Sequence, residues 1–297
     1  GPKHTQEIKA EFAFGDNSYY FELKPTTSES FLIKVEKERY REQSWRIIGR
    51  GNRESNITKN KDERSVVYPG SFGVGYYIHH AISNWVVYHF HDTSDNAPMR
   101  RSEITADNMR LRQDASNVAP FLLELRDDEP KCYDEVIEAI RLVTPFFDDF
   151  ILKPKKKGKK EKVNLSWKQK GSDYPMQPYH FSDGTIRFIC LAMALLQPDP
   201  PSTIVIDEPE LGLHPYAIEI LAELIRAASE KTQVIVSTQS PLLIDSFNSE
   251  DIIVVSRKKG ASTFKRLDAK ELSHWLKDYS LGELWRKNIV AGGPVHE

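Results

Sequence analysis

The sequence predicts an α/β fold in which a parallel sheet with helices is joined by an antiparallel β subdomain and a helical subdomain. Apolar residues alternate with period two near the start, recur at helical spacing in the middle, and follow a helix, strand, helix, strand order from Phe181 onward. Strands separated by helices are typical of parallel sheets with crossover connections. We expect three parts, covering residues 1–75, 76–180 and 181–297.

The first part is predicted to be an antiparallel meander over residues 6–48. Three runs alternate between apolar and polar residues, which is typical of half-buried strands. Their apolar members are Ile8, Ala10, Phe12 and Phe14, then Tyr19, Phe21 and Leu23, then Phe31, Ile33 and Val35. Residues 50–64 are polar and rich in Asn, Lys and Glu, which predicts an exposed loop with few core anchors.

The second part mixes strand and helix patterns. Residues 85–90 are strand-like, whereas residues 116–125 and 133–143 carry apolar side chains at helical spacing and are predicted to pack on a core as two helices. Residues 150–152 and 163–167 are apolar and flank a lysine-rich segment. This arrangement indicates a hairpin, and we interpret the whole part as a helical and β-hairpin lid subdomain.

In the third part, helix and strand patterns alternate, as in a parallel sheet with helical crossovers. Ile186–Leu196 is apolar on nearly all sides and predicts a buried helix, which the prolines after Gln197 end. Thr203–Asp207 and Val234–Ser237 are short apolar runs that predict buried strands, with a helix striped from Ala217 to Ala228 between them. The remaining patterns predict a hairpin over residues 252–264 around Lys258, Lys259 and Gly260, and helices near residues 272–285.

Composition excludes several classes of protein. The formal net charge is −2, so no global basic field indicates a nucleic acid, and any DNA contact would be a local patch. Two cysteines, Cys132 and Cys190, do not make a disulfide framework and suit a reducing cytoplasm. No apolar run approaches the roughly 20 residues that span a bilayer. We therefore expect a cytoplasmic protein without membrane partners.

Two adjacent acids end the strand that begins at Thr203. Asp207 and Glu208 fall at its carboxyl end, where open parallel sheets bind ligands, and Pro209 favours an extended backbone at Glu208. One carboxylate could hold Mg²⁺ while the next orients a water, as phosphoryl transfer requires. The alternative is a chance acid pair that caps the following helix.

Two further polar segments accompany these acids. Ser182, Asp183, Gly184 and Thr185 begin a helix, and the unpaired N–H groups of a helix N-terminus attract phosphate, with Gly184 allowing close backbone approach. An ordinary N-cap is the alternative. The second predicted strand ends in a polar set that could sense a γ-phosphate: Ser237, Thr238, Gln239 and Ser240.

In order and in residues, these segments resemble the ABC-type ATPase head, with helices around a P-loop NTPase-like parallel sheet. The signature loop matches Phe181–Thr185, the Walker B strand Thr203–Glu208, the D-loop Pro209–Pro215 and the switch Gln239. The residues 207–215, Asp-Glu-Pro-Glu-Leu-Gly-Leu-His-Pro, followed by Ser-Thr-Gln-Ser-Pro at 237–241, resemble the RecF/SMC-like soluble branch. Within that branch they look most like the AAA_21-like bacterial "predicted ATPase" group, a relative of the OLD-family ATPases. The resemblance implies that residues 181–297 form a C-terminal ATPase lobe.

The same resemblance implies ATP and Mg²⁺ as cofactors, with Asp207 helping to hold the metal and Glu208 as the catalytic base. Gln239 would sense the γ-phosphate, although transporter heads usually have His there. Nucleotide contacts are implied for Ser182, Asp183, Gly184, Thr185 and His214, the last where an Asp is more usual. Because such heads sandwich nucleotide between two copies, the resemblance implies a homodimer.

The phosphate loop of such heads does not occur among the 297 residues. The loop requires Gly-x-x-x-x-Gly-Lys-Ser/Thr, because glycines expose N–H groups and the Lys and hydroxyl complete the phosphate and metal contacts. Gly158-Lys159-Lys160 lacks the hydroxyl and upstream Gly, and the glycines of residues 70–75 have no Lys. We expect an N-terminal P-loop unit of about 30 residues or more to be missing, and the chain alone to be inactive.

Two other features remain open to two interpretations. Lysines crowd residues 153–162, which is typical of a solvated hairpin tip but could also neutralise DNA phosphates. His79, His80, His89 and His91 could suggest a metal, yet without Cys or a fitting third ligand we favour core or hydrogen-bonded histidines.

The sequence thus predicts an ATP-binding and hydrolysing head that dimerises on nucleotide to drive a DNA-related task, such as repair or defence against phage. DNA or a separately encoded effector would be its partner. The alternative is a binding module that uses the same scaffold without turnover, which the missing phosphate loop favours. A built-in nuclease is a third possibility, but after Val255 too little chain follows for an OLD-type TOPRIM domain.

Overall fold

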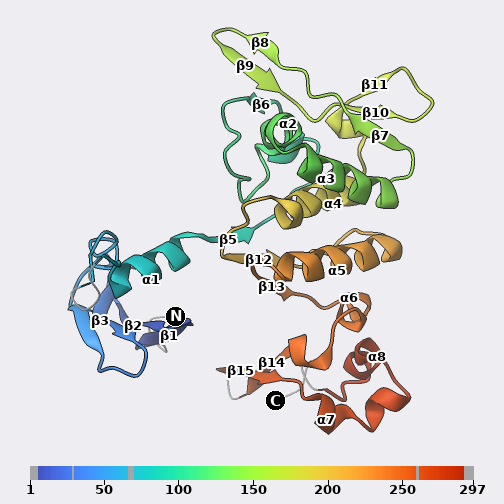
Figure 1. Ribbon diagram of the computed structural model, residues 1–297. Helices are drawn as coiled ribbons and strands as arrows, with labels where there is room; N and C mark the ends of the chain where they lie inside the picture. Colours follow the sequence, from blue (N-terminus) through green and yellow to red (C-terminus); the bar gives the residue numbers. More distant parts are fainter. Residues whose placement is uncertain (1–5, 29, 66–69, 259–260, 291–297) are drawn as a thin grey trace. The chain divides into compact units, whose positions relative to one another are not determined.

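The computed structural model describes residues 6–28, 30–65, 70–258 and 261–290 (Figure 1). Its contacts divide the chain into two compact units, Gly1–Trp85 and Val86–Glu297, and each is described by itself. The three-part division expected from the sequence stays a prediction, whereas the mixture of parallel and antiparallel sheets with helices agrees with the predicted α/β class.

The first unit is an antiparallel meander with strand order β1-β2-β3-β4, as predicted for residues 6–48. Its strands are β1 (Ile8–Phe14), β2 (Asn17–Pro25), β3 (Phe31–Tyr40) and β4 (Arg46–Gly49). Helix α1 (Val74–Ser83), which the sequence analysis did not predict, packs on this sheet. Tyr19, Ile57 and Ile78 form the small core between them.

The loop over residues 50–64 has few core anchors, as expected, and Ile57 is its one buried residue. Ile57 lies in the core with 6 % of its surface exposed. The buried Glu36 carboxylate accepts hydrogen bonds from the Tyr19 hydroxyl at 2.6 Å and from the Asn56 N–H at 2.8 Å. Besides Ile57, the hydrogen bond to the buried Glu36 thus holds this polar segment on the sheet.

The second unit holds the remaining sheets and most helices. Its strands are β5 (Trp85–Tyr88), which starts at the boundary, β6 (Glu103–Ile104), β7 (Phe147–Phe150), β8 (Lys155–Lys157), β9 (Lys160–Val163), β10 (Trp167–Gln169), β11 (Pro175–Met176), β12 (Thr203–Asp207), β13 (Gln233–Ser237), β14 (Ile253–Lys258) and β15 (Ala261–Arg266). Its α-helices are α2 (Val118–Asp128), α3 (Pro130–Val143), α4 (Asp183–Leu196), α5 (Pro215–Ser229), α6 (Pro241–Asp245), α7 (Ala269–Leu272) and α8 (Leu281–Arg286). No helix of the described residues is both long and apolar enough to cross a membrane.

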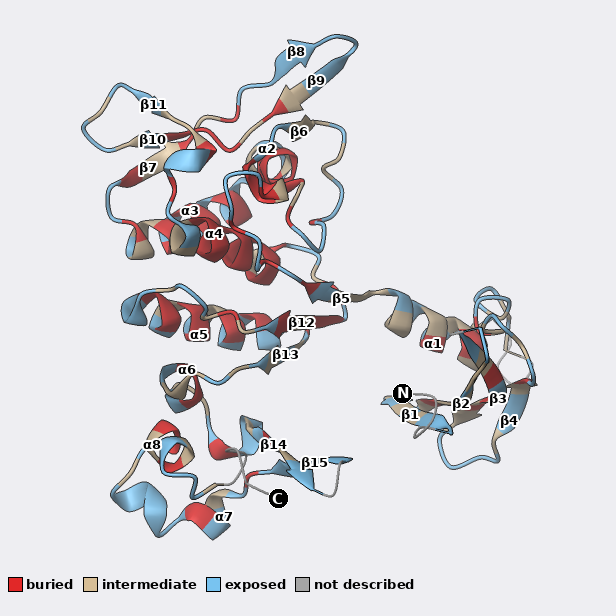
Figure 2. Ribbon diagram, turned by 180° about the vertical axis from the view of Figure 1, so that it is seen from behind, coloured by how far each residue is buried: buried red, intermediate tan, exposed pale blue. Residues whose placement is uncertain are grey.

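Helix α4 is the centre of the larger core. All its residues from Ile186 to Leu195 are buried, and it packs against both α3 and α5 (Figure 2). Burying one large aliphatic side chain contributes about 1.5–3 kcal/mol, so this helix is a main source of the unit's stability. The predicted buried helix is confirmed, and the predicted helices over residues 116–125 and 133–143 correspond to α2 and α3.

The parallel sheet has the order β13-β12-β5, with β12 in the middle. Strands β12 and β13 are parallel, in register from Thr203 opposite Gln233 to Asp207 opposite Ser237, as predicted. Strand β13 is not buried on both faces, however, and 48 % of Ile235 is exposed. In the described part of the chain β13 pairs on one side only, which leaves it with a free edge.

Both predicted hairpins are present. Strands β14 and β15 pair antiparallel, and the expected turn residues Lys259 and Gly260 lie outside the described residues. In the other hairpin the lysines themselves form strands β8 and β9, which pair antiparallel around Gly158. The apolar flanks pair with each other, because Phe150 of β7 lies opposite Trp167 of β10 and the Ile151 N–H donates to the Ser166 carbonyl at 2.7 Å. The lysine-rich segment is therefore a strand pair and not merely a tip.

Candidate functional site

The carboxyl ends of β12 and β13 meet at one edge of the parallel sheet. The register places Asp207 opposite Ser237, whose hydroxyl donates a hydrogen bond to the Asp207 carboxylate. The second carboxylate oxygen of Asp207 lies 3.8 Å from Nε2 of His91, which follows β5. The Asp207 side chain is 57 % exposed. An acid that is partly paired and partly open to solvent can still accept a cation.

Glu208 has an uncommon backbone. Its φ is +41°, so the extended conformation expected before Pro209 was wrong. The Glu208 N–H donates to the Ser237 carbonyl at 2.8 Å, and the Glu208 carbonyl accepts from the Leu211 N–H at 3.2 Å, which closes a tight turn. A non-glycine residue in this region costs about 1–3 kcal/mol, which the surrounding hydrogen bonds must offset.

The side chain of Glu208 points to the end of the neighbouring strand. Nε2 of Gln239 donates to Oε1 of Glu208 at 3.2 Å, and one step along, the Thr238 hydroxyl donates to Oε1 of Glu210 at 2.6 Å. Gln239 is exposed and Glu208 is half-buried. The structure therefore brings together the two residues predicted to be catalytic and places them beside Asp207.

The predicted signature loop caps α4. The Thr185 N–H donates to Oγ of Ser182 at 3.1 Å, and the two hydroxyls are 2.8 Å apart. Ahead of this cap, Phe181 is buried and stacks on Trp167, with ring centroids 4.6 Å apart. The ordinary N-cap is thus present, while the Ser182 and Asp183 side chains remain exposed.

Gly184 packs against the turn that follows β12. A Cβ atom at this position would overlap the carbonyl oxygen of Gly212, which belongs to main chain and cannot swing away. The glycine is therefore required by the fold itself, besides any role in approaching a phosphate. Past the turn, His214 caps α5, because its Nδ1 accepts the Tyr216 N–H at 3.3 Å.

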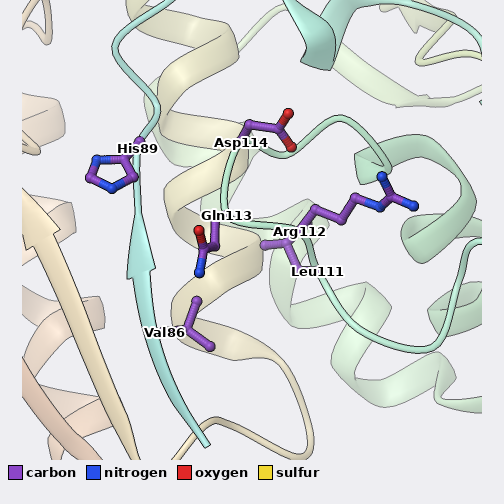
Figure 3. Close-up of a pocket in the computed structure, with 6 residues that line it drawn as sticks. All are labelled: Val86, His89, Leu111, Arg112, Gln113 and Asp114. Atoms are coloured by element: carbon purple, nitrogen blue, oxygen red, sulfur yellow. The ribbon is translucent and has the colours of Figure 1, made fainter. Parts of the chain in front are cut away.

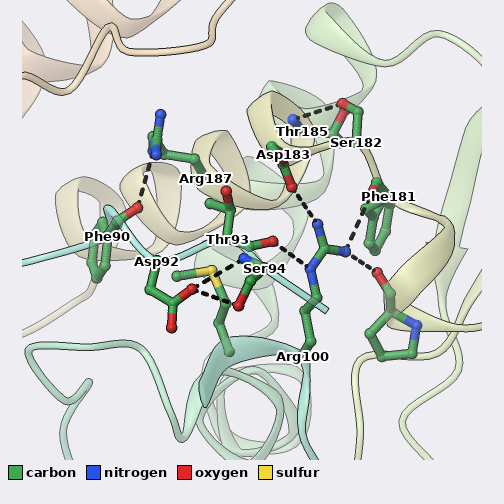
Figure 4. Close-up of polar contacts among 12 residues, drawn as sticks. Phe90, Asp92, Thr93, Ser94, Arg100, Phe181, Ser182, Asp183, Thr185 and Arg187 are labelled. Atoms are coloured by element: carbon green, nitrogen blue, oxygen red, sulfur yellow. Dashed lines mark hydrogen bonds and ion pairs between the residues drawn. The ribbon is translucent and has the colours of Figure 1, made fainter. Parts of the chain in front are cut away.

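A buried arginine, Arg100, holds the signature loop from below (Figure 4). Its guanidinium donates to the carbonyls of Thr93 at 3.0 Å, Pro178 at 2.6 Å and Phe181 at 3.0 Å. It also pairs with Oδ1 of Asp183 at 3.0 Å. One of these bonds reaches the segment after β5, and the others reach the residues just before α4 and its first residue, Asp183. Arg100 therefore fixes the position at which α4 begins.

A second buried arginine, Arg187, joins the loops around the site (Figure 4). From α4 it donates to the Phe90 carbonyl at 3.0 Å, to the His91 carbonyl at 3.1 Å and to the Leu211 carbonyl. Burial lowers the pKa of Arg187. The segment after β5, the turn after β12 and the signature helix are thus held by one side chain.

The predicted residues fall into two clusters. Asp207, Glu208 and Gln239 form one, and residues 182–185 form the other; among the described residues no hydrogen bond joins them directly. Arg187 and the turn before His214 connect the clusters. Sequence reasoning missed Arg100 and Arg187, although a single arginine inside the apolar run of residues 186–196 was a usable signal. It named His91 only as a core or hydrogen-bonded histidine, not as a neighbour of Asp207.

The predicted site residues do not line the cavity shown in Figure 3. This groove of about 480 Å³ lies beside β5, and its lining residues are Val86, His89, Leu111, Arg112, Gln113 and Asp114. The His89 N–H donates to the Gln113 carbonyl at 2.9 Å, which holds the loop along the strand. The candidate site is instead the open edge of the sheet.

The donors at this edge fit one side of a nucleotide and metal complex. Mg²⁺ usually binds one or two protein carboxylates together with water and substrate phosphates, and Asp207 is an exposed carboxylate of that kind. Within the described residues no group of three or more His, Cys, Asp or Glu side chains could hold a metal alone. A Mg²⁺ ion bound by Asp207 would complete its ligands with phosphate and water oxygens.

Replacing Gly184 with Ala tests the packing of the signature loop. We expect the free energy of unfolding to fall by about 1–3 kcal/mol, because the added methyl forces α4 away from the turn at Gly212. Chemical denaturation followed by tryptophan fluorescence measures this loss. Ser262→Ala on the exposed strand β15 is the control, and equal stability of both variants would contradict the packing.

Most of the chain matches one family of known proteins. A family profile, AAA_21, described as "AAA domain, putative AbiEii toxin, Type IV TA system", matches residues 4–245. No curated protein matches the chain significantly.

Solved structures similar to the chain include heads of SMC proteins. One is the SmcHead bound to the C-winged helix domain of ScpA, at 12 % identity and a TM-score of 0.47 over 88 % of this chain and 77 % of that one. Another is the Smc head domain with an extended coiled coil bound to the C-terminal domain of ScpA, derived from Pyrococcus furiosus. It has 14 % identity and a TM-score of 0.44, and the match covers 89 % of this chain and 80 % of that one. A third comes from work on ATP-driven dimerization and DNA stimulated activation of SMC ATPases. It has 21 % identity and a TM-score of 0.38, and the match covers 52 % of this chain and 94 % of that one.

Proposed function

The chain belongs to the AAA_21 family, a family of ATPases, and from this we propose that it supplies the hydrolytic side of an ATP site that forms between two copies. The observation that carries the proposal is the Gln239–Glu208 hydrogen bond beside Asp207, at the carboxyl ends of two parallel strands. Ligands of open parallel sheets bind at this edge.

Each residue at the edge has a distinct task in this proposal. When bound, ATP with Mg²⁺ supplies the phosphoryl group and the charge that stabilises its transfer. Asp207 holds the metal through Oδ2, which lies 3.8 Å from Nε2 of His91, while Ser237 fixes Oδ1. Glu208 accepts the proton of the attacking water, and Gln239 keeps the Glu208 carboxylate turned toward the edge.

The phosphate-holding loop is proposed to lie along β13. A parallel strand added to the free edge of β13 would carry the loop at its end to the side of Asp207 and Gln239. The exposed face of Ile235 would then be covered by the helix after that loop. No phosphate-loop string occurs in the 297 residues, so this unit is proposed to come from elsewhere in the protein or from a partner.

The signature loop is proposed to act across the dimer. Helix α4 has 14 residues, and its N-terminus presents the exposed side chains of Ser182 and Asp183. Such an end binds the γ-phosphate held by a second copy. Gly184, Thr185 and the exposed His214 border the same surface and are proposed as the other nucleotide contacts.

The task driven by hydrolysis is proposed to be DNA-directed, in repair or in defence against phage, with DNA or a separately encoded effector as partner. The family description, which names a toxin of a toxin–antitoxin system, favours defence. A non-hydrolysing binding module is the second candidate, favoured by the lack of a phosphate-loop string in this chain.

Nucleotide-dependent dimerisation tests the shared site. In the natural reading frame that contains this chain, ATP is expected to convert monomer to dimer in analytical ultracentrifugation, and Ser182→Arg is expected to prevent this by blocking the helix end. Ser262→Arg on β15 should dimerise like the wild type. Dimerisation of both variants alike would exclude the signature loop from the interface, and binding of ATP without turnover would favour the second candidate.

A further inference from the structure

The β8/β9 hairpin places lysines directly opposite lysines. Lys155 pairs with Lys162 and Lys157 with Lys160 in the antiparallel register. Since residues two apart in a strand share a face, all four side chains lie on one face of the hairpin. Lys156 lies opposite Glu161 on the other face. We call the set Lys155, Lys157, Lys160 and Lys162 the lysine face.

The lysine face is turned away from the core. Val163, which shares the opposite face with Glu161, is 1 % exposed and belongs to the main core. Lys155, Lys157 and Lys160 are exposed and Lys162 is half-buried. Among the described residues none of the four has an ion pair.

This arrangement costs stability when nothing is bound. Like charges directly opposite each other in a strand pair destabilise it by a few tenths of a kcal/mol or more. Edge strands often carry lysine to prevent aggregation, and β8 is an edge. Strand β9, however, is the central strand of the β6-β9-β8 sheet, so edge protection does not account for Lys160 and Lys162.

We propose that the lysine face is a binding surface for the phosphate backbone of double-stranded DNA. Cβ atoms of opposite lysines are about 5 Å apart and those of successive lysines on one strand about 7 Å apart. The long lysine side chains can therefore bring four ammonium groups to neighbouring phosphates of one duplex. The proposal deepens the DNA-directed task proposed above, but it does not depend on nucleotide or on turnover.

The composition of the hairpin favours duplex DNA over other polyanions. Residues 155–162 contain no aromatic side chain on which single-stranded bases could stack, and no apolar one that could enter a membrane. Duplex DNA has the denser charge, one per about 1.7 Å of axis. Binding through these lysines alone is therefore independent of base sequence.

The size of the effect follows from counterion release. Four phosphate contacts give a slope of about −3.6 in a plot of log affinity against log salt concentration. This face alone would then weaken binding about 150-fold between 50 and 200 mM salt. A variant that lacks the four charges should lose that part of the slope.

The test compares two charge-matched variants of the 297-residue chain without nucleotide. The face variant is Lys155→Gln, Lys157→Gln, Lys160→Gln and Lys162→Gln; the control is Lys153→Gln, Lys156→Gln, Lys159→Gln and Lys168→Gln. Fluorescence anisotropy with a 30-base-pair duplex, between 50 and 200 mM salt, gives affinity and slope. The face variant is expected to reduce the slope by about 3.6, and the control by less than about 1.

Three results would overturn the proposal. Equal slopes for the two variants would mean that the lysines act only through net charge. Tighter binding to a thirty-residue oligothymidine than to the duplex, or to phosphatidylserine vesicles in place of DNA, would assign the surface to another polyanion. Circular dichroism of each variant shows whether the hairpin change leaves the fold intact. A variant that loses ATP turnover at the proposed nucleotide site would keep the same salt dependence of DNA affinity. The DNA-binding proposal and the proposed function can therefore fail independently.

Discussion

Glu208→Gln is expected to lower ATP turnover by about two to four orders of magnitude in the natural reading frame that contains this chain. The substitution keeps the shape of the side chain and its bond with Gln239 but removes the base that accepts the proton of the attacking water. Nucleotide binding should change little, because Glu208 is proposed to act on water and not on the phosphates. Steady-state phosphate release and equilibrium ATP binding measure the two quantities separately.

The matched control is Glu219→Gln, which removes the same charge from the exposed side of α5. Turnover by this variant should equal that of the wild type. If Glu208→Gln hydrolysed ATP at the wild-type rate, Glu208 would not be the base. Turnover that is undetectable in every form, together with ATP binding, would support the module without hydrolysis.

Arg187→Met is expected to lower the free energy of unfolding by about 1–3 kcal/mol. Methionine fills a similar apolar volume but leaves the carbonyls of Phe90, His91 and Leu211 without their donor. The Phe90 carbonyl is buried and carries the main cost, whereas water can reach the carbonyls of the exposed residues His91 and Leu211. Denaturant unfolding of the 297-residue chain measures the loss.

Arg101→Met, at an exposed arginine, is the control and should be close to neutral. Arg187→Lys separates charge from geometry, since an ammonium group cannot reach three carbonyls in the arrangement of a guanidinium. An intermediate loss is expected for Lys. A loss below about 1 kcal/mol for Met would show that the carbonyls find other donors and that Arg187 does not hold the three segments together.

Local patterns were sufficient for the elements that carry the candidate site. The strand Thr203–Asp207 and helix α4 follow from short apolar runs closed by prolines or acids, and both were predicted nearly to the residue. Helix α1 was missed because it opens among glycines and carries aromatic and β-branched residues, such as Tyr76 and Ile78, that are typical of strands.

Features that depend on distant contacts could not be predicted. Arg187 bonds with a carbonyl 97 positions away, and Arg100 with one 81 positions away, which no local pattern reports. The positive φ of Glu208 opposes the preference of a residue before proline and is set by the Ser237 carbonyl of the next strand. The lysine face likewise depends on the register of two strands, which sequence composition does not contain.

The free edge of β13 links the colloidal behaviour of the protein to the assembly of its site. A strand with unpaired main-chain groups and an exposed Ile235 is a template for a strand from any neighbouring molecule, which is how edge-to-edge aggregation starts. The strand that would complete the sheet and carry the phosphate loop would also cover this template. In the proposed arrangement, the pairing that forms the nucleotide site would also protect the chain against aggregation.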